Sequence, residues 1–566
     1  MALRADLRRR RRPPRRRTAP TACRRGPGGP AVEDSPDVKD DAEQCFAAQN
    51  MAGISLLWAL ARIDHREAVH RLLHRVLCLV KPKQQANTKE QAMPTGWTPV
   101  RLPFHPLGRR RVDAAFDGGH VSSDGGALLL REAAQLSDFF GRVAACFVDH
   151  RNPAFVEHSL AELVAQRMLA LACGYEDLND HDTLRCDPMF ALAVGKADPF
   201  GQSRRMSRDS GRALAGHATL NRLETAPAAL HSDRRDLKIL HDPSALERLF
   251  VQLFLDAHDR APNEIVLDLD ATDDPVHGGQ EGRFFHGYYG HYCYLPLYIF
   301  CGNFVLVAKL REANQDGAAG ALEEVQRVVA HIREQWPAVR IVIRGDSGFC
   351  RDALMDWCEQ TEGVDYILGL ARNTRLAAEI SDDMAATEAE VERTGASART
   401  YRDFRYRTQS TWSRERRVVG KAEVLVGKRN PRFVVTSLSP DAISASALYE
   451  DVYCARGEME NRIKEQQLGM FADRTSSHTM RANQLRLWFS ALAYALVNEL
   501  RAVALVGTEL ATAQVWTIRT RLLKVGAVVQ QSVRRLRIAL SSAFPLQEVW
   551  AHALHRIRDV REDLAM

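Results

Sequence analysis

The 566-residue chain lacks the features of secreted, zinc-binding and membrane-spanning proteins. Its eleven cysteines include no CxxC or CxxH pair, which argues against a zinc module and against a disulfide framework. The N-terminal arginines are followed by proline and more arginine instead of an apolar segment, so no signal peptide is visible. The charge-free apolar stretch Leu487–Val497 is too short to span a bilayer. These absences predict a cytoplasmic protein with reduced thiols.

Outside the first 25 residues the chain has no net positive charge. The formal net charge is +6, although residues 1–25 alone contain eleven Arg and one Asp. The remainder of the chain is therefore slightly acidic, and any affinity for nucleic acid must come from local patches. One such patch is Arg399–Arg432, with eleven Arg or Lys residues against three acids.

The first part of the chain divides into a biased extension and a helical region. Residues 1–92 are rich in Arg, Pro and Gly and predict a disordered basic extension, within which a helix could cover Ser55–Val80. We expect this extension to be dispensable, with Met93 as the start of the working protein; a DNA-binding tail is the alternative. Residues 93–262 predict helices over 125–135, 159–173 and 188–195.

The segment GYEDLNDHDTLRCDP, at residues 174–188, carries five acids between two predicted helices. A calcium loop would need the Gly and Glu positions of an EF-hand, and this segment lacks them. The acids therefore predict helix caps and turns.

From residue 263 the pattern changes to that of a mixed sheet. The CGN turn between the second and third predicted strands indicates a hairpin, and the element order fits an α/β fold with helices on the faces of the sheet. The predicted strands cover residues 265–271, 292–300, 304–310, 339–345 and 364–370, and the predicted helices cover 320–335 and 352–360. The resulting division is a catalytic core over 263–371 and 446–508, a β-rich basic insertion over 372–445 and a C-terminal region over 509–566.

Three acidic residues occupy positions from which their side chains can meet. Asp270 and Asp346 end apolar strands, and Glu460 lies in a polar helix. Strand alternation places Asp268 and Asp270 on one face of their strand, and Arg344 and Asp346 on one face of theirs. Carboxylates from two strand ends and a helix can converge on paired Mg²⁺ ions and support phosphoryl transfer on nucleic acid. For Asp346 alone, a cap on the following helix is the alternative.

The helix that contains Glu460 predicts two stripes of different chemistry. A helical repeat puts a polar stripe about 100° from an apolar one, so the apolar stripe can pack on the sheet while the polar one faces a cleft. Tyr, Arg and Lys beside one carboxylate suit phosphate binding next to a metal. A solvated face with pairs such as Glu460–Lys464 is the alternative. The polar stripe is Tyr453, Arg456, Glu460, Lys464 and Gln467, and the apolar stripe is Val452, Ala455, Met459 and Ile463.

The basic insertion interleaves aromatic residues with arginines, an arrangement that suits phosphate contacts and base stacking. Trp412 lies among Arg and polar residues, so we expect it to be exposed and able to stack on an unpaired base. The alternative is a twisted surface hairpin in which Trp412 packs against the strands of the insertion. The other aromatic residues are Tyr401, Phe404 and Tyr406.

Taken together, these motifs resemble those of DDE transposases of bacterial insertion sequences, in particular the thirteen-eighty group within the class that carries a YREK signature. The resemblance extends from about Thr95 to the end of the chain. It implies a ribonuclease-H-like catalytic core with a β insertion before the last catalytic helix, and a helical DNA-binding region for the transposon ends over 93–262. The blocks that carry it are RRVDAAFDGGHVSSDGGALLLRE, GYEDLNDHDTLRCDP, LDLDATDDPVHGGQEG, IRGDSGF and YCARGEMENRIKE.

The resemblance also implies roles for individual residues. Asp270, Asp346 and Glu460 match the catalytic, metal-binding triad, and Tyr453 and Arg456 match the Tyr and Arg of the signature. The Lys position of the signature is occupied by Gln467, so Lys464 could take over its contact with DNA. In hairpin-forming relatives an aromatic residue of the insertion holds a flipped base, a role that Trp412 would fill here.

The implied cofactor is a pair of Mg²⁺ ions, for which Mn²⁺ can substitute. The implied partners are the terminal inverted repeats of a transposon, target DNA and a second copy of the chain on the paired ends, with no membrane.

Two other functions fit parts of the sequence. LDLDATDD matches the DxDxT motif of haloacid-dehalogenase-like phosphohydrolases, with Asp268 as nucleophile and Asp270 as acid. That assignment leaves the polar helix stripe and the basic insertion unexplained. A domesticated DNA-binding protein without catalytic activity is the non-enzymatic alternative, and the intact triad argues against it.

Overall fold

The computed structural model describes residues 101–229 and 237–565. The predicted basic extension over 1–92, its possible helix and the proposed start at Met93 lie outside these residues. Contacts group Pro99–Met566 into one unit, so the predicted helical region and the predicted catalytic core belong to the same body.

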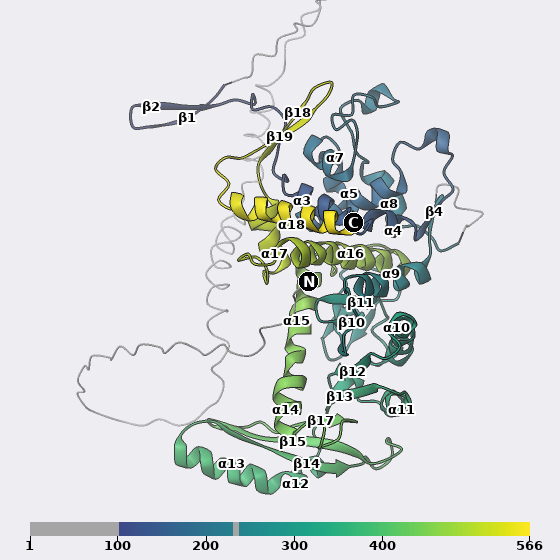
Figure 1. The fold of residues 1–566 in the computed structure, drawn as a ribbon, viewed down its shortest axis with the longest axis vertical. Helices are drawn as coiled ribbons and strands as arrows, with labels where there is room; N and C mark the ends of the chain where they lie inside the picture. Colours follow the sequence, from purple (N-terminus) through teal and green to yellow (C-terminus); the bar gives the residue numbers. More distant parts are fainter. Residues whose placement is uncertain (1–100, 230–236, 566) are drawn as a thin grey trace, which may run out of the picture. The chain divides into compact units, whose positions relative to one another are not determined.

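A nine-stranded mixed sheet organises this unit (Figure 1). Its three central strands, β6, β12 and β13, are parallel, and strands on both sides join in antiparallel pairs. This agrees with the mixed α/β sheet expected from the sequence. The order is β11 (Phe304–Lys309), β10 (Leu297–Cys301), β6 (Glu264–Ala271), β12 (Arg340–Gly345), β13 (Val364–Leu370), β17 (Arg432–Thr436), β15 (Arg416–Leu425) and β14 (Ala398–Tyr406), with β16 (Lys428–Arg429) paired to β15.

The two faces of the sheet bury different partners because side chains alternate along each strand. Leu267 and Leu269 pack with residues of helices α9 (Pro243–Asp256), α10 (Ala321–Gln335) and α11 (Asp352–Gln360). On the opposite face, apolar side chains of β12, β13, β15 and β17 pack with Leu448 and Tyr449 of a later helical run. The second face also carries Asp268 and Asp270, as strand alternation predicted.

The predicted insertion is not a separate module. Its strand β17 pairs with β13, and β15 and β14 follow, so the insertion extends the sheet of the predicted core edge to edge. Helices α12 (Thr374–Glu379) and α13 (Ser381–Thr394) precede these strands, and Leu376, Ile380 and Met384 pack into the same apolar core as the central strands.

The helices before the sheet pack around a long helix that comes after it. The buried apolar side chains of α16 (Met480–Ala504) belong to one core with those of α3 and α5, and α18 packs on α16 (Figure 1). The helices predicted over 125–135, 159–173 and 188–195 are confirmed as α3, α5 and α7. The helices of this layer are α3 (Ala127–Ala134), α4 (Phe139–Ala144), α5 (Leu160–Cys173), α6 (His181–Leu184), α7 (Pro188–Val194), α8 (His217–Glu224), α17 (Val515–Ile518) and α18 (Gln547–Ala565).

Four small sheets complete the described residues. They pair β1 (Leu102–Leu107) with β2 (Arg110–Ala114), β4 (Phe147–Asp149) with β5 (Ile239–His241), β18 (Ala527–Gln531) with both β3 (Val121–Ser122) and β19 (Leu536–Leu540), and β9 (His291–Tyr294) with both β7 (Asp274–Pro275) and β8 (Phe284–His286). Among the helices described, none combines the length and apolarity needed to cross a membrane.

The acid-rich link between α5 and α7 consists of caps and turns, as predicted. The Asp177 carboxylate accepts a hydrogen bond from the backbone N–H of Asn179 at 3.0 Å, and Asp187 accepts from Met189 and Phe190 at the start of α7. These bonds satisfy N–H groups that a helix leaves without an internal partner.

One predicted strand is wrong. Residues 292–300 form two strands in different sheets instead of one. Pro296 lies between β9 and β10 and has no N–H to donate to a ladder, and the chain changes sheets there. The hairpin around the CGN turn is confirmed, since β10 and β11 pair in antiparallel fashion on either side of it.

Candidate active site

Asp270 and Asp346 lie at the ends of adjacent parallel strands. The register pairs Arg344 on β12 with Asp268 on β6, so the next positions on the same face, Asp346 and Asp270, are neighbours. The carboxylate of Asp270 accepts a hydrogen bond from the N–H of Ala271 at 2.9 Å. That of Asp346 accepts from Gly348 N–H at 2.8 Å and caps the turn after β12, so the capping role weighed for Asp346 is present.

Glu460 is delivered by an unusual helical run. Residues 445–469 form a continuous series of helical turns in which α15 (Gly457–Lys464) lies between π-helical turns at Leu448–Tyr453 and Glu465–Gly469. A 3₁₀ turn at Cys454–Arg456 separates the first π segment from α15. Such changes of pitch alter which residues share a face, and π turns are frequent at functional sites. Of the predicted apolar stripe, Met459 and Ile463 are buried.

Arg456 links the acids from the strand and from the helix. Its guanidinium Nη2 lies 3.4 Å from Asp270 Oδ2, and its Nη1 donates to Glu460 Oε1 at 2.8 Å. Burial lowers the pKa of Arg456, but the negative charges of Asp270, Asp346 and Glu460 outweigh it, and the pKa is raised. One cationic side chain therefore sits within the electrostatic reach of all three carboxylates.

The environment of Asp270 favours bound positive charge. Burial, opposed by Arg456 and assisted by the nearby carboxylates of Asp346 and Glu460, raises the pKa of Asp270 to about 6. Like-charged groups held this close gain from a cation between them. Oxygen-only ligands of this kind suit Mg²⁺ or Mn²⁺ better than Zn²⁺.

The donor chemistry therefore fits a divalent metal, although Arg456 lies between two of the three carboxylates. Within residues 101–229 and 237–565, no three Asp, Glu, His or Cys side chains are grouped closely enough to ligate an ion. The guanidinium of Arg456 lies where it interacts with both Asp270 and Glu460, so a metal held by these two would need Arg456 to move.

The remaining residues of the predicted polar stripe fall in three settings. Tyr453 is partly buried, and its ring lies 5.5 Å from that of Tyr449. A Cβ on Gly369 would come within 2.6 Å of the Tyr453 hydroxyl, so this position in β13 must lack a side chain. Lys464 is exposed. The Gln467 side chain donates to the backbone carbonyl of Asp273 at 3.0 Å, which attaches the helical run to the segment after β6.

A buried ion pair that the sequence analysis did not identify supports this site. The Arg344 guanidinium donates to both carboxylate oxygens of Asp268, at 2.7 Å for Nη2, and both residues are almost fully buried. Arg344 also donates through Nη1 to the backbone carbonyl of Val452 in the helical run. The pair thus connects β6 and β12 to the helix that carries Tyr453, Arg456 and Glu460. The available signal in the sequence was a pair of charged residues, Asp268 and Arg344, each two residues before a candidate acid and on the same strand face.

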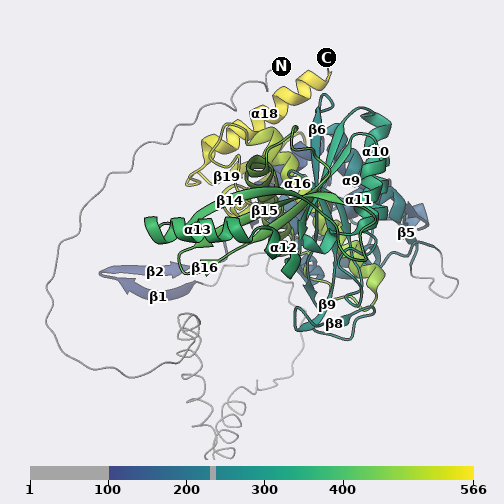
Figure 2. The ribbon, with the colours of Figure 1, turned by 90° about the horizontal axis from the view of Figure 1, so that it is seen from below.

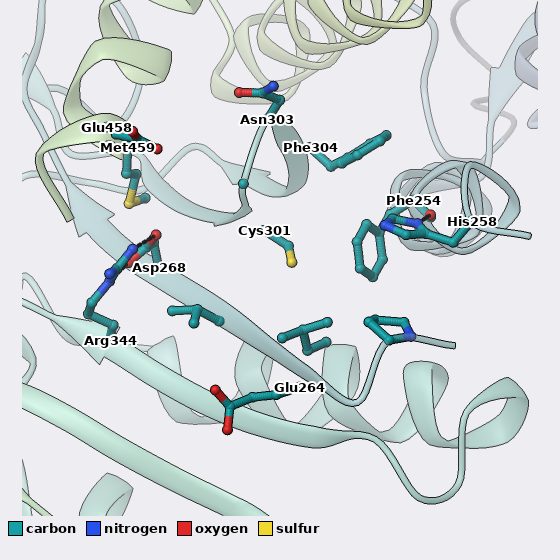
Figure 3. Close-up of a pocket in the computed structure, with 14 residues that line it drawn as sticks. Phe254, His258, Glu264, Asp268, Cys301, Asn303, Phe304, Arg344, Glu458 and Met459 are labelled. Carbon is teal, nitrogen blue, oxygen red and sulfur yellow. Dashed lines mark hydrogen bonds and ion pairs between the residues drawn. The ribbon is translucent and has the colours of Figure 1, made fainter. Parts of the chain in front are cut away.

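Figure 3 shows Asp268 and Arg344 turned toward each other at one wall of a cavity of about 370 Å³. Glu458 and Met459 of α15 line the same wall, and Phe254 and His258 lie across the cavity. Asp268 is only 5% exposed and is held by Arg344 on both oxygens, so it is not available as the nucleophile of a phosphohydrolase.

The prediction that Trp412 is exposed is wrong. Its side chain is 4% exposed, meets the ring of Tyr406 edge-on at 5.8 Å and has the Arg416 guanidinium 5.6 Å above it. The sequence suggested exposure because its neighbours are polar, but those neighbours fold over the ring. The alternative in which Trp412 packs against the strands of the insertion matches the structure.

Much of the positive charge of the insertion is paired. Arg416 is buried against Asp352 and Glu359 of α11, and Arg417 is buried against Asp403. These acids offset the local excess that the sequence shows, and several of them come from elements outside the insertion. Further pairs are Arg402–Asp383, Arg414–Asp356, Lys421–Glu423, Arg429–Glu388 and Arg399–Glu450.

We expect Trp412→Ala to act through stability. Removing a buried aromatic side chain of this size costs about 3–5 kcal/mol of unfolding free energy. Urea unfolding should show that loss, and every activity of the protein should decline together with the folded fraction. Trp412→Phe, which keeps a ring against Tyr406, should lose much less. A Trp412→Ala protein with unchanged unfolding and a defect in one late step only would contradict this.

The comparisons with known proteins identify the family of this chain. Residues 104–562 match the family described as transposase DDE domain group 1. A comparison with curated proteins gives no match. Among solved structures, the chain is similar to that in the cryo-EM structure of a piggyBac transposase synaptic complex with hairpin DNA, with 12% identity, a TM-score of 0.34, and coverage of 71% of this chain and 80% of that one. Because the family match spans most of its length, the chain belongs to the DDE transposase domain group 1 family.

Proposed function

We propose that this protein is a DNA transposase of the YREK-signature class, within the thirteen-eighty group, that cuts DNA at the ends of a transposon and joins them to target DNA. Family membership supports transposition as the process. The observation that carries the assignment of the site is Arg456, whose guanidinium contacts Asp270 on a strand and Glu460 on a helix. Asp346 is next to Asp270 by strand register.

In this proposal Asp270, Asp346 and Glu460 hold two Mg²⁺ ions, and Mn²⁺ can substitute. Ions in such sites activate water and stabilise charge at a reacting phosphate. Tyr453, Arg456 and Lys464 contact the DNA backbone beside them. Arg456 is suited to this because a planar guanidinium can leave a carboxylate for a phosphate without loss of charge-assisted hydrogen bonds.

The substrate would be a terminal inverted repeat, and the product a free 3′-hydroxyl that attacks target DNA, in a cut-and-paste pathway without a covalent enzyme–DNA intermediate. We propose that the nine-stranded sheet contains a ribonuclease-H-like core, that residues 93–262 bind the ends, and that a homodimer holds the paired ends. Trp412 is excluded from the DNA-contacting residues because it is buried.

The test uses the full chain and linear DNA that carries the inverted repeats flanking its gene. We expect cleavage at the repeat boundary in Mg²⁺ or Mn²⁺, with loss of all cleavage in EDTA and little in Zn²⁺, because the candidate ligands are carboxylate oxygens only. Mapping the cut ends by sequencing gives the position and the free 3′-hydroxyl. Cleavage supported best by Zn²⁺ would contradict the metal assignment. Binding of the ends without cleavage in any metal would identify a DNA-binding protein that has lost its activity.

A further inference from the structure

An aromatic hairpin stands directly beside the candidate active site. Strand β8 pairs with β9, and β9 pairs with β7, which begins at Asp274, shortly after Asp270 in the chain. The hairpin projects from the strands around it (Figure 2). Neither the motifs of the sequence analysis nor the proposed metal site gives this hairpin a role.

The inner side of the hairpin is fixed next to Asp270. Tyr289 and Ala271, which follows Asp270, pack against the same small apolar cluster around Cys293. The His291 ring lies 2.8 Å from the carboxylate of Asp273. Burial, followed by the negative charges of Asp273 and Asp270, raises the pKa of Tyr289 to about 12, which places the phenol within the field of those carboxylates.

The outer side of the hairpin presents rings to solvent. Phe285 is 57% exposed, Tyr288 is 87% exposed and Tyr292 is 47% exposed. Phe285 and Tyr292 meet edge-on at 5.6 Å, and the Arg283 guanidinium lies 4.5 Å over the Tyr292 ring. Exposed aromatic rings grouped in this way, on a hairpin whose inner side is fixed next to Asp270, indicate a surface that a ligand covers during function.

We propose that the outer face of this hairpin binds unpaired bases of DNA next to the phosphate to be cut, with Phe285, Tyr288 and Tyr292 as stacking rings and Arg283 as the phosphate or base contact. This rests on the function proposed above, because it takes DNA as the substrate of the carboxylate site. Aromatic rings stack on any base, which suits a surface that must work beside a variable flanking sequence. A second protein chain would also cover exposed rings, but the Arg283 guanidinium over the Tyr292 ring favours a polyanion.

The experiment compares two probes in EDTA, so that no cleavage is required. One is a fluorescent duplex of the inverted repeat, and the other is the same duplex with a mixed-sequence single-stranded tail of about ten nucleotides, a length within the usual range for single-strand sites. Phe285→Leu/Tyr288→Leu keeps apolar side chains but removes two rings. We expect the double variant to lose roughly tenfold or more of its affinity for the tailed probe, and less than about twofold for the duplex.

Two controls separate stacking from other causes. Tyr288→Phe keeps the ring and should bind the tailed probe as the parent does. Leu564→Ala removes a comparably exposed apolar side chain, 68% exposed, from the C-terminal helix and should change neither affinity. Unfolding curves of all variants should overlay, because the rings that are removed face solvent.

Three results would overturn the proposal: a Leu variant that binds the tailed probe as tightly as the parent, an equal loss for both probes, or a change in the oligomeric mass by light scattering, which would assign the rings to a second copy of the chain. Failure of the proposed function would look different. The parent would then leave the inverted repeats uncut in Mg²⁺, whatever the hairpin variants bind.

Discussion

Asp270→Asn, Asp346→Asn and Glu460→Gln are each expected to abolish metal-dependent strand cleavage. Each change removes a negative charge from the carboxylate group around Arg456. Loss of one metal ligand removes several kcal/mol of transition-state stabilisation, so the cleavage rate should fall by at least roughly a thousandfold. Gel analysis of the inverted-repeat substrate measures the rate, and a binding assay in EDTA should show that affinity for the ends changes by only a few-fold.

Glu458→Gln is the matched control for the helix. It removes a carboxylate two positions from Glu460, on the same helix and also exposed, and it should cut DNA at nearly the parental rate. Glu465 is unsuitable as a control because it is fully buried between Arg462 and Arg501. If Glu460→Gln retained cleavage and Glu458→Gln lost it, Glu458 would be the third metal ligand. The proposal that Glu460 faces Asp270 and Asp346 would then be wrong.

Arg344→Met is expected to destabilise the protein strongly. It would leave the Asp268 carboxylate buried without its partner, and breaking a buried ion pair from one side costs about 3–5 kcal/mol. Chemical unfolding measures this loss. Arg340→Met is the control on the same strand. Arg340 is exposed and pairs with Glu264 and Asp365 at the surface, so its loss should cost less than about 1 kcal/mol.

The double change Asp268→Leu/Arg344→Met separates stability from positioning. Replacing both members of a buried pair with apolar residues is often neutral for stability, so the double variant should unfold much closer to the parent. It would still lack the hydrogen bond from Arg344 to the carbonyl of Val452. Cleavage should therefore stay low while stability returns. Full recovery of both would mean that Arg344 serves the core alone, and parental unfolding of Arg344→Met would contradict the whole argument.

The parts of the fold that follow from local pattern could be predicted from the sequence. Helix α11 and strand β13 have the predicted bounds, because apolar spacing and flanking turns define them without help from distant residues. The predictions for Trp412 and for the strand over 292–300 were wrong because both depend on distant residues. The burial of Trp412 depends on α11 and β14. The division of residues 292–300 into two strands depends on the pairing of β9 with β7 and β8.

The candidate site shows the same division between local and distant causes. Strand alternation indicates from the sequence which residues share a face with Asp270 and with Asp346, but the neighbouring positions of these two acids also depend on the parallel register of β12 on β6. The contact of Arg456 with Asp270 depends on π and 3₁₀ turns before α15, and a repeat of constant pitch cannot anticipate them. The Arg344–Asp268 pair required the register of β12 on β6, which only the structure supplies.

The edge-to-edge pairing of β17 with β13 has a mechanical consequence. Hydrogen bonds run without interruption from β10, beside Asp270, to β14 at the far end of the insertion, so a load applied at one end is carried through the backbone to the other. If DNA binds along this sheet, the stiffness of the paired strands fixes the distance between the bound segment of DNA and the site of cleavage. Movements of the site during the reaction would then come from the helical run with its π turns. Side-chain hydrogen bonds of Arg344 and Gln467 attach this run to the sheet and to the segment after β6.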